Sequence, residues 1–220
     1  MNTNACGLIA VLVVAPIALA GCDSSSGGGP GPGTPTLSSQ PSSSTTQDEI
    51  AAALLTPTDL GAGFTKAEFR PSSNPLPCLP TGAPLEEKFS ATVSAGTALV
   101  SNAGGASFSE EVRLYPDEAT AQQVVAYISQ GLDCRTGQLA LTGPAQTIDI
   151  GKQQDITSTV NADGAFAVQT SAPRFNIVLA AARLGRSVTL FAFLKTKSTP
   201  DSALPNPIQV VAKALDKIRS

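Results

Sequence analysis

The sequence has 220 residues, with 14 Lys and Arg against 17 Asp and Glu, a formal net charge of −3 and no histidine. An acidic chain without clustered basic residues is not expected to bind nucleic acid, because phosphate binding needs Lys and Arg. The lack of histidine excludes Ser-His-Asp and Cys-His catalysis and most zinc sites.

An uncharged apolar run, GLIAVLVVAPIALA at residues 7–20, lies near the start of the chain. Its length of about 14 residues falls short of the ~20 that a membrane-spanning helix needs. An apolar run of this length that ends in small side chains is typical of a secretion signal. No Lys or Arg precedes it, so only the terminal amine supplies the positive charge usual there. We expect residues 1–21 to be a signal peptide outside the folded domain.

The stretch Leu19-Ala20-Gly21-Cys22 resembles the lipobox of bacterial lipoproteins. In that family the chain is cut before the cysteine, here between Gly21 and Cys22, and the thiol receives a diacylglyceryl group with fatty acyl chains such as palmitate. Two or more acyl chains anchor a protein stably. The resemblance therefore implies attachment to the extracytoplasmic face of the cell membrane through Cys22. The alternative is an ordinary signal peptide cut near Gly21, which leaves Cys22 as a plain thiol.

Residues 23–46 are nearly all Ser, Gly, Thr or Pro. Such a composition cannot bury enough apolar surface to offset the entropy lost on ordering. We expect the lipidated cysteine and this segment, residues 22–46, to form a flexible tether with an r.m.s. reach of about 25–30 Å. The remaining residues, 47–220, are long enough for one domain with a sizeable core.

Two of the four cysteines, Cys78 and Cys134, lie in this expected domain. Thiols outside the cytoplasm tend to oxidise, so the simplest prediction is a disulfide between them. A bridge across a loop of this length stabilises a fold by about 4 kcal/mol. A metal or redox pair is the alternative, but it would need CxxC spacing or histidine ligands. We therefore expect no metal and no cofactor.

The first half of the domain is expected to combine two helices with short strands. Thr46-Gln47-Asp48-Glu49 has the form of a capping box, which predicts a helix that starts at Thr46 and is stopped by Pro57. A short strand is predicted in 64–70, followed by an irregular Pro-rich segment at 71–84. Antiparallel strands are predicted through 89–93 and 107–116, with turn residues at 102–105. A helix is predicted from Asp117 to about Gly131.

The second half contains the most apolar segment of the mature chain, residues 175–196, which predicts a central hairpin packed by helices. Residues 161–164 predict a tight hairpin turn. A last helix is predicted from Asn206 as N-cap and Pro207 at the first helical position. Taken together these elements predict a single α+β domain, an antiparallel sheet with helices on one side. Further short strands are predicted in QLALTG (138–143), QTIDIG (146–151), DITSTV (155–160) and GAFAVQTS (164–171).

The sequence contains no GxSxG, SxxK or phosphate-binding glycine loop, and no catalytic residue is predicted. The adjacent carboxylates Glu110 and Glu111 would point to opposite faces of a strand, so they cannot act together, and we expect both to be solvated. The same expectation holds for Glu86 and Glu87.

The segment around Asn161, Asp163 and Gly164 has a weak likeness to a calcium loop. Thr159 and Thr170 occupy the first and last ligand positions of that loop, so two ligands are missing. A hairpin turn is the favoured interpretation.

Three stretches resemble the actinobacterial extracellular sensor domains of the PknH-like family, which includes mycobacterial lipoproteins. They are LLTPTDLGAGF at 54–64, FSEEVRLYPDEATAQQVVAYISQGLDC at 108–134 and RFNIVLAAARLGRSVTLFAFL at 174–194. The resemblance implies an antiparallel sheet with packed helices, a cleft for ligand binding and no catalytic activity. Members of that family typically have two disulfides, whereas this domain can form only Cys78–Cys134. No ligand-contacting residue matches well enough to be transferred.

The favoured hypothesis is a membrane-anchored lipoprotein with a non-catalytic ligand-binding or sensor-like domain, whose ligand is a small molecule, a lipid or a cell-wall component. The alternative is a carrier of lipid or other apolar envelope molecules, although Ala-rich runs such as VLAAARL favour an ordinary packed core over a cavity. A hydrolase that uses only carboxylates is the third hypothesis, with Glu110, Glu111, Asp149 and Asp155 as its candidates.

Overall fold

A computed structural model describes residues 46–71, 73–140 and 145–220. The predicted signal peptide, the lipobox residues Gly21 and Cys22, and the tether up to residue 45 lie outside the described residues. In the part that is described, helices pack against one large antiparallel sheet, so the predicted α+β class is confirmed.

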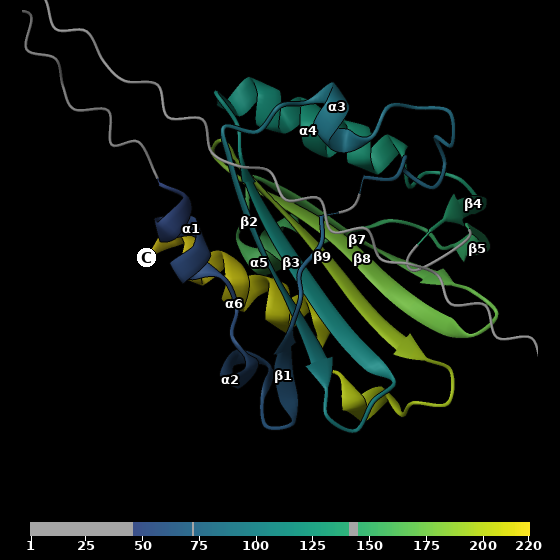
Figure 1. Ribbon diagram of the computed structural model, residues 1–220. Helices are drawn as coiled ribbons and strands as arrows, with labels where there is room; N and C mark the ends of the chain where they lie inside the picture. Colours follow the sequence, from purple (N-terminus) through teal and green to yellow (C-terminus); the bar gives the residue numbers. More distant parts are fainter. Residues whose placement is uncertain (1–45, 72, 141–144) are drawn as a thin grey trace, which may run out of the picture. The chain divides into compact units, whose positions relative to one another are not determined.

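The sheet has nine strands among the described residues, in the spatial order β1-β2-β3-β9-β8-β7-β5-β4, and β6 lies beside β7 (Figure 1). All pairs are antiparallel, and the predicted central hairpin is formed by β8 and β9. Gly185 in its turn has a φ of 54°, a conformation that glycine adopts readily. The strands are β1 (Phe64–Ala67), β2 (Val93–Ser101), β3 (Ala106–Leu114), β4 (Thr136–Leu139), β5 (Gln146–Ile150), β6 (Gln154–Asp155), β7 (Gly164–Ser171), β8 (Phe175–Leu184) and β9 (Ser187–Thr196).

Helices cover both faces of this sheet, with α4 on one side and α6 on the other (Figure 1). Successive residues of a strand point to opposite faces, and β8 is apolar on both. Its Ala180 and Ala182 pack toward α6, whereas Ala181 packs toward α4. The expectation of helices on one side is therefore wrong. The helices are α1 (Gln47–Ala53), α2 (Pro57–Leu60), α3 (Leu85–Lys88), α4 (Glu118–Gln130), α5 (Thr157–Val160) and α6 (Pro207–Arg219), with a 3-10 turn at Asp201–Ala203.

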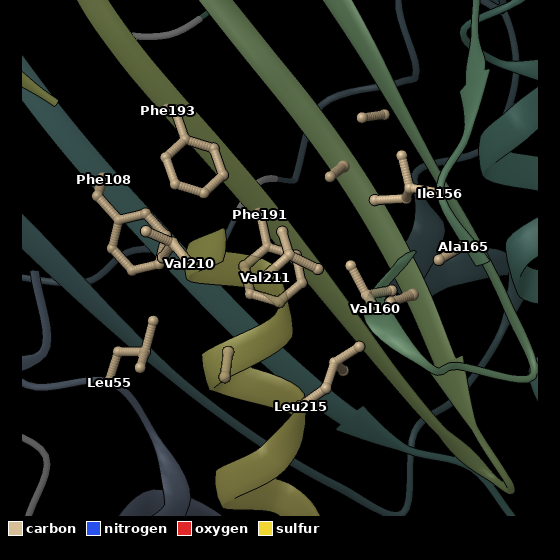
Figure 2. Packing of buried hydrophobic residues seen from close by; sticks show 14 of the residues in the cluster. Leu55, Phe108, Ile156, Val160, Ala165, Phe191, Phe193, Val210, Val211 and Leu215 are labelled. Carbon is tan, nitrogen blue, oxygen red and sulfur yellow. The ribbon is translucent and has the colours of Figure 1, made fainter. Parts of the chain in front are cut away.

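The core on the α6 side is built around aromatic rings. Figure 2 shows Val210 of α6 beside Phe108 of β3, and Val211 of α6 beside Phe191 of β9. The Phe108 and Phe193 ring centroids are 5.0 Å apart. The predicted start of α6 is confirmed, with the Asn206 side chain accepting from the backbone N–H of Ile208 and Pro207 opening the helix.

The core on the α4 side is closed by the predicted disulfide. Cys78 and Cys134 are bonded, with their Cα atoms 5.8 Å apart, which ties the Pro-rich segment to the exit of α4. The Cys78 N–H also donates to the carbonyl of Gly131 at 2.9 Å. A Cβ at Gly131 would lie 2.3 Å from the Leu76 side chain, so glycine is needed for this close approach.

The segment DITSTV is not a strand. Its first residue ends the short strand β6, and the next residues form helix α5, which ends at Asn161 with a φ of 52°. The Asp155 carboxylate accepts from the Thr157 N–H, and the Thr157 hydroxyl accepts from the Ala165 N–H. These side-chain to backbone bonds offset the strand preference of the β-branched residues. The tight hairpin turn predicted at 161–164 is therefore also wrong, because these residues connect α5 to β7.

The corner between α1 and α2 is held by charged side chains from β3 and α6. The Leu55 N–H donates to Oε2 of Glu110 at 2.8 Å, and Lys217 Nζ donates to the Leu54 carbonyl at 2.7 Å. Lys217 also lies 3.1 Å from Asp59. Both polar groups of one peptide unit are thus bound by ionisable side chains. The capping box at Thr46 is confirmed, but α1 ends at Ala53, before Pro57, and Pro57 is instead the first residue of α2.

Glu110 is fully buried, which contradicts the expectation that it is solvated. Its Oε1 has no hydrogen-bond partner among the described residues. Burial raises the pKa of Glu110 to about 7, although the Leu55 N–H and the charge of Lys217 oppose the rise. Burial acts in the same direction on Asp59, but hydrogen bonds from Thr56 and the two lysines of α6 hold the pKa of Asp59 below its ordinary value.

Replacement of both disulfide cysteines, Cys78→Ala with Cys134→Ala, should lower stability by about 4 kcal/mol, because the unfolded chain gains the freedom of the opened loop. The expected fall in melting temperature is about 10 °C, measured by circular dichroism. An unchanged melting temperature, in the double variant or in the native protein under reducing conditions, would contradict the stabilising role of the bridge.

Glu110 should make stability fall as the pH rises. Its pKa is higher in the folded state, so folding is favoured below pH 4.5, and this contribution is lost between pH 4.5 and about 7. The loss amounts to about 3 kcal/mol. Urea unfolding at a series of pH values should show a flatter profile in this window for Glu110→Gln, with the exposed Glu87→Gln as a matched control. Equal slopes in both variants would contradict the assignment.

Candidate functional site

The most unusual polar group of the domain is an ion pair on the α4 face of β3. The Arg113 Nε donates to Oε1 of Glu111 at 2.8 Å, and the two residues are 4% and 8% exposed. They lie two residues apart, so the strand directs both side chains to one face. Strand β2 covers one flank, where Gly96 faces Glu111 and Ser94 faces Arg113.

This ion pair forms part of the lining of an open pocket of about 390 Å³. Its walls include Phe89 and Ala91, which follow helix α3, together with Ser94 of β2. The Phe69 ring packs directly against Gly96, because a Cβ built at Gly96 would lie only 2.2 Å from that ring. The absence of a side chain at Gly96 therefore lets residues 67–71 approach the sheet.

The Arg113 side chain is 5% exposed at the pocket, and the outer part of its guanidinium makes no hydrogen bond to a carboxylate among the residues described. The nearest second carboxylate is Glu86, whose Oε2 lies 3.9 Å from Nη2, beyond hydrogen-bonding distance. The Tyr115 hydroxyl lies close by but makes no well-aligned hydrogen bond. The terminal nitrogens of Arg113 therefore remain available as donors, beside the oxygen acceptors of Glu86 and Glu111.

The electrostatics keep Arg113 charged. Burial would lower the pKa of Arg113, but the hydrogen bond and charge of Glu111 outweigh it and raise that pKa. Burial also raises the pKa of Tyr115, which stays a neutral phenol. With Glu86 at its rim the pocket holds one cation and two carboxylates, so it offers donors and acceptors without an excess of positive charge.

The other carboxylates singled out from the sequence are not gathered into a catalytic group. Glu111 is buried rather than solvated, which corrects that expectation, and it lies on the opposite face from Glu110. Glu86 and Glu87 are exposed, as expected. Asp149 and Asp155 are exposed on separate strands.

The weak calcium-loop likeness has a structural explanation. The Asp163 carboxylate accepts from the Gly185 N–H at 2.6 Å and lies 3.6 Å from Arg183. These contacts bind the start of β7 to the turn of the central hairpin. No group of three or more metal-ligating side chains occurs among the described residues.

Sequence reasoning missed Arg113. The signal was present as Glu111-x-Arg113, a charged pair at strand spacing on either side of Val112. Glu111 was expected to be solvated, so its pairing with Arg113 was not considered. Their burial follows from the second layer formed by α3 and α4.

No helix in the described ranges is long and apolar enough to cross a membrane. Searches of family models and of curated proteins found no match to the sequence. Among solved structures, the extracellular domain of PknH from Mycobacterium tuberculosis is similar, with a TM-score of 0.61 at 12% sequence identity. The match covers 80% of this chain and 97% of that domain. At this identity the likeness establishes the fold, and the fold implied by the sequence resemblance is confirmed.

Proposed function

We propose that the protein is a membrane-anchored extracytoplasmic lipoprotein whose domain binds a polar ligand without catalysing a reaction. The observation that carries the binding role is the buried Glu111–Arg113 pair in the lining of an open pocket. The lipobox at Cys22 supports the anchor, and a fold shared with an extracellular domain supports the location.

A buried ion pair is a weak source of stability, because removing two charges from water costs about as much as their attraction returns. The ion pair from Arg113 to Glu86 is 3.9 Å long, beyond hydrogen-bonding distance, so it holds α3 only weakly. The arrangement suits recognition better. Donors and acceptors fixed in a pocket can match the hydroxyl or amide groups of a small molecule or a cell-wall fragment.

The pocket fits a polar ligand better than the apolar cargo of a lipid carrier. Charged side chains lie in its lining, and Ser90 and Ser94 add hydroxyl groups to its walls. Behind the sheet, the packed rings of Phe108, Phe191 and Phe193 occupy the volume that an internal lipid would need. A non-enzymatic role accords with the absence of histidine and the separation of the carboxylates.

Replacement of the predicted lipidation site, Cys22→Ala, should move the protein from the membrane fraction to the soluble fraction, because no acyl chains can be attached. Fractionation of the native host followed by immunoblotting measures the shift. The intact mass of the wild-type protein provides the control, since it should include the diacylglyceryl group. Membrane retention of the variant would contradict the anchor.

Replacement of the pair by apolar residues, Glu111→Leu with Arg113→Met, should leave stability unchanged or raised, because two buried charges are removed together. Arg113→Met alone should cost about 3–5 kcal/mol by leaving a buried carboxylate unpaired. Thermal unfolding measures both effects.

The same double variant should lose the ligand. Native mass spectrometry of protein purified from its own host should show a bound polar molecule on the wild type and on Arg135→Gln, an exposed control, but not on the double variant. A wild type without bound mass, or equal binding by the double variant, would contradict the proposed site.

A further inference from the structure

A second pocket lies on the other face of the sheet, between α1, the last turns of α6 and the ends of the central strands. Its volume is about 640 Å³, within the range of sites that hold one small ligand. Val112 and Leu114 contribute to its lining, and they point away from the face that carries Glu111 and Arg113. The two pockets are therefore separate sites.

Apolar residues make up one side of the lining of this second pocket. Ile50 of α1 and Ile218 of α6 line it together with Val112, Leu114 and Leu184 of the strands. Ile50, Val112 and Leu114 are themselves buried, so the apolar surface that borders the open space comes from the half-buried Ala53, Leu184 and Ile218. Covering such a surface with an apolar chain releases water and favours binding.

Cations surround the apolar lining. Arg186, Lys217 and Arg219 all border the pocket. Lys217 is paired with Asp59, and Arg219 is paired with Asp216. The Arg186 guanidinium makes no hydrogen bond or ion pair with any residue that the structure describes. It therefore supplies a positive charge that is not already neutralised.

A buried hydroxyl lies beside this cation in the chain. Ser187 lines the pocket and is 8% exposed, and its Oγ has no hydrogen-bond partner in the described part of the chain. A buried polar atom without a partner is unfavourable, and a ligand that accepts a hydrogen bond would relieve it. The acidic side chain in the lining, Glu49, is already engaged, because it accepts from the Thr46 N–H at 2.7 Å.

We infer that this pocket binds a single-chain anionic amphiphile of the fatty-acid class. Its carboxylate would meet Arg186 and Ser187, and its apolar chain would cover the surface formed by Ala53, Leu184 and Ile218. The volume suits one acyl chain rather than the two of a phospholipid. This site does not depend on the polar ligand proposed for the Glu111–Arg113 pocket.

The test uses the chain from Asp23 to Ser220, which keeps every residue that the structure describes and lacks the predicted lipidation site. Isothermal titration calorimetry would compare dodecanoate with dodecylammonium, which has a similar apolar chain and the opposite charge. The variants are Arg186→Gln, Ser187→Ala and Arg174→Gln. Arg174 is an exposed arginine before β8, at the opposite end of that strand from Arg186, and serves as the matched control. Circular dichroism would verify that each variant is folded.

Dodecanoate should bind more tightly than dodecylammonium, and Arg186→Gln should weaken dodecanoate binding about tenfold while Arg174→Gln leaves it unchanged. Ser187→Ala should weaken it by a smaller factor without loss of the fold. Equal binding of the two amphiphiles, no dodecanoate binding, or equal effects of the two arginine variants would overturn the inference. So would binding to anionic phospholipid vesicles without binding to dodecanoate monomers, because that result assigns the surface to a membrane.

Discussion

Helices on both faces of the sheet leave the central strands no side that faces bulk water, and this constraint governs the rest of the domain. Strand β8 satisfies this constraint because it has small and apolar residues on both faces, so α4 and α6 can approach the strand closely. β3 carries charged residues in the same layer. Isolated charges are costly to bury. Each of these side chains must therefore bind a partner, change its protonation state or border a pocket.

The neighbours Glu110 and Glu111 show two solutions to that constraint. Glu110 faces α6, accepts a hydrogen bond from the Leu55 N–H and has a pKa raised by burial. Glu111 faces α4, pairs with Arg113 and borders a pocket. Glu110 holds the α1–α2 corner, whereas its neighbour Glu111 can contact a ligand. The two differ because successive residues of a strand point to opposite faces of the sheet.

Elements with their own local signals could be predicted from the sequence. The Asp117 and Asn206 caps, the apolar hairpin and the disulfide were all identified correctly. The second helical layer could not be, since the Ala-rich run of β8 gives no contrast between its faces. α5 was missed because its threonines favour strands, whereas hydrogen bonds around Thr157 fix a helical turn. The pocket at Arg113 depends on that second layer, so it was missed as well.

The contacts at the α1–α2 corner determine how the domain would respond to mechanical load. A pull applied at Thr46 reaches the Leu54–Leu55 peptide through α1, and there the hydrogen bonds from Glu110 and Lys217 resist it together with the buried side chains of this segment. The Cys78–Cys134 bond encloses β2, β3 and α4 in a covalent loop, so this part of the chain cannot be drawn out to its full contour length. Force would thus detach the first two helices while the central strands stay folded.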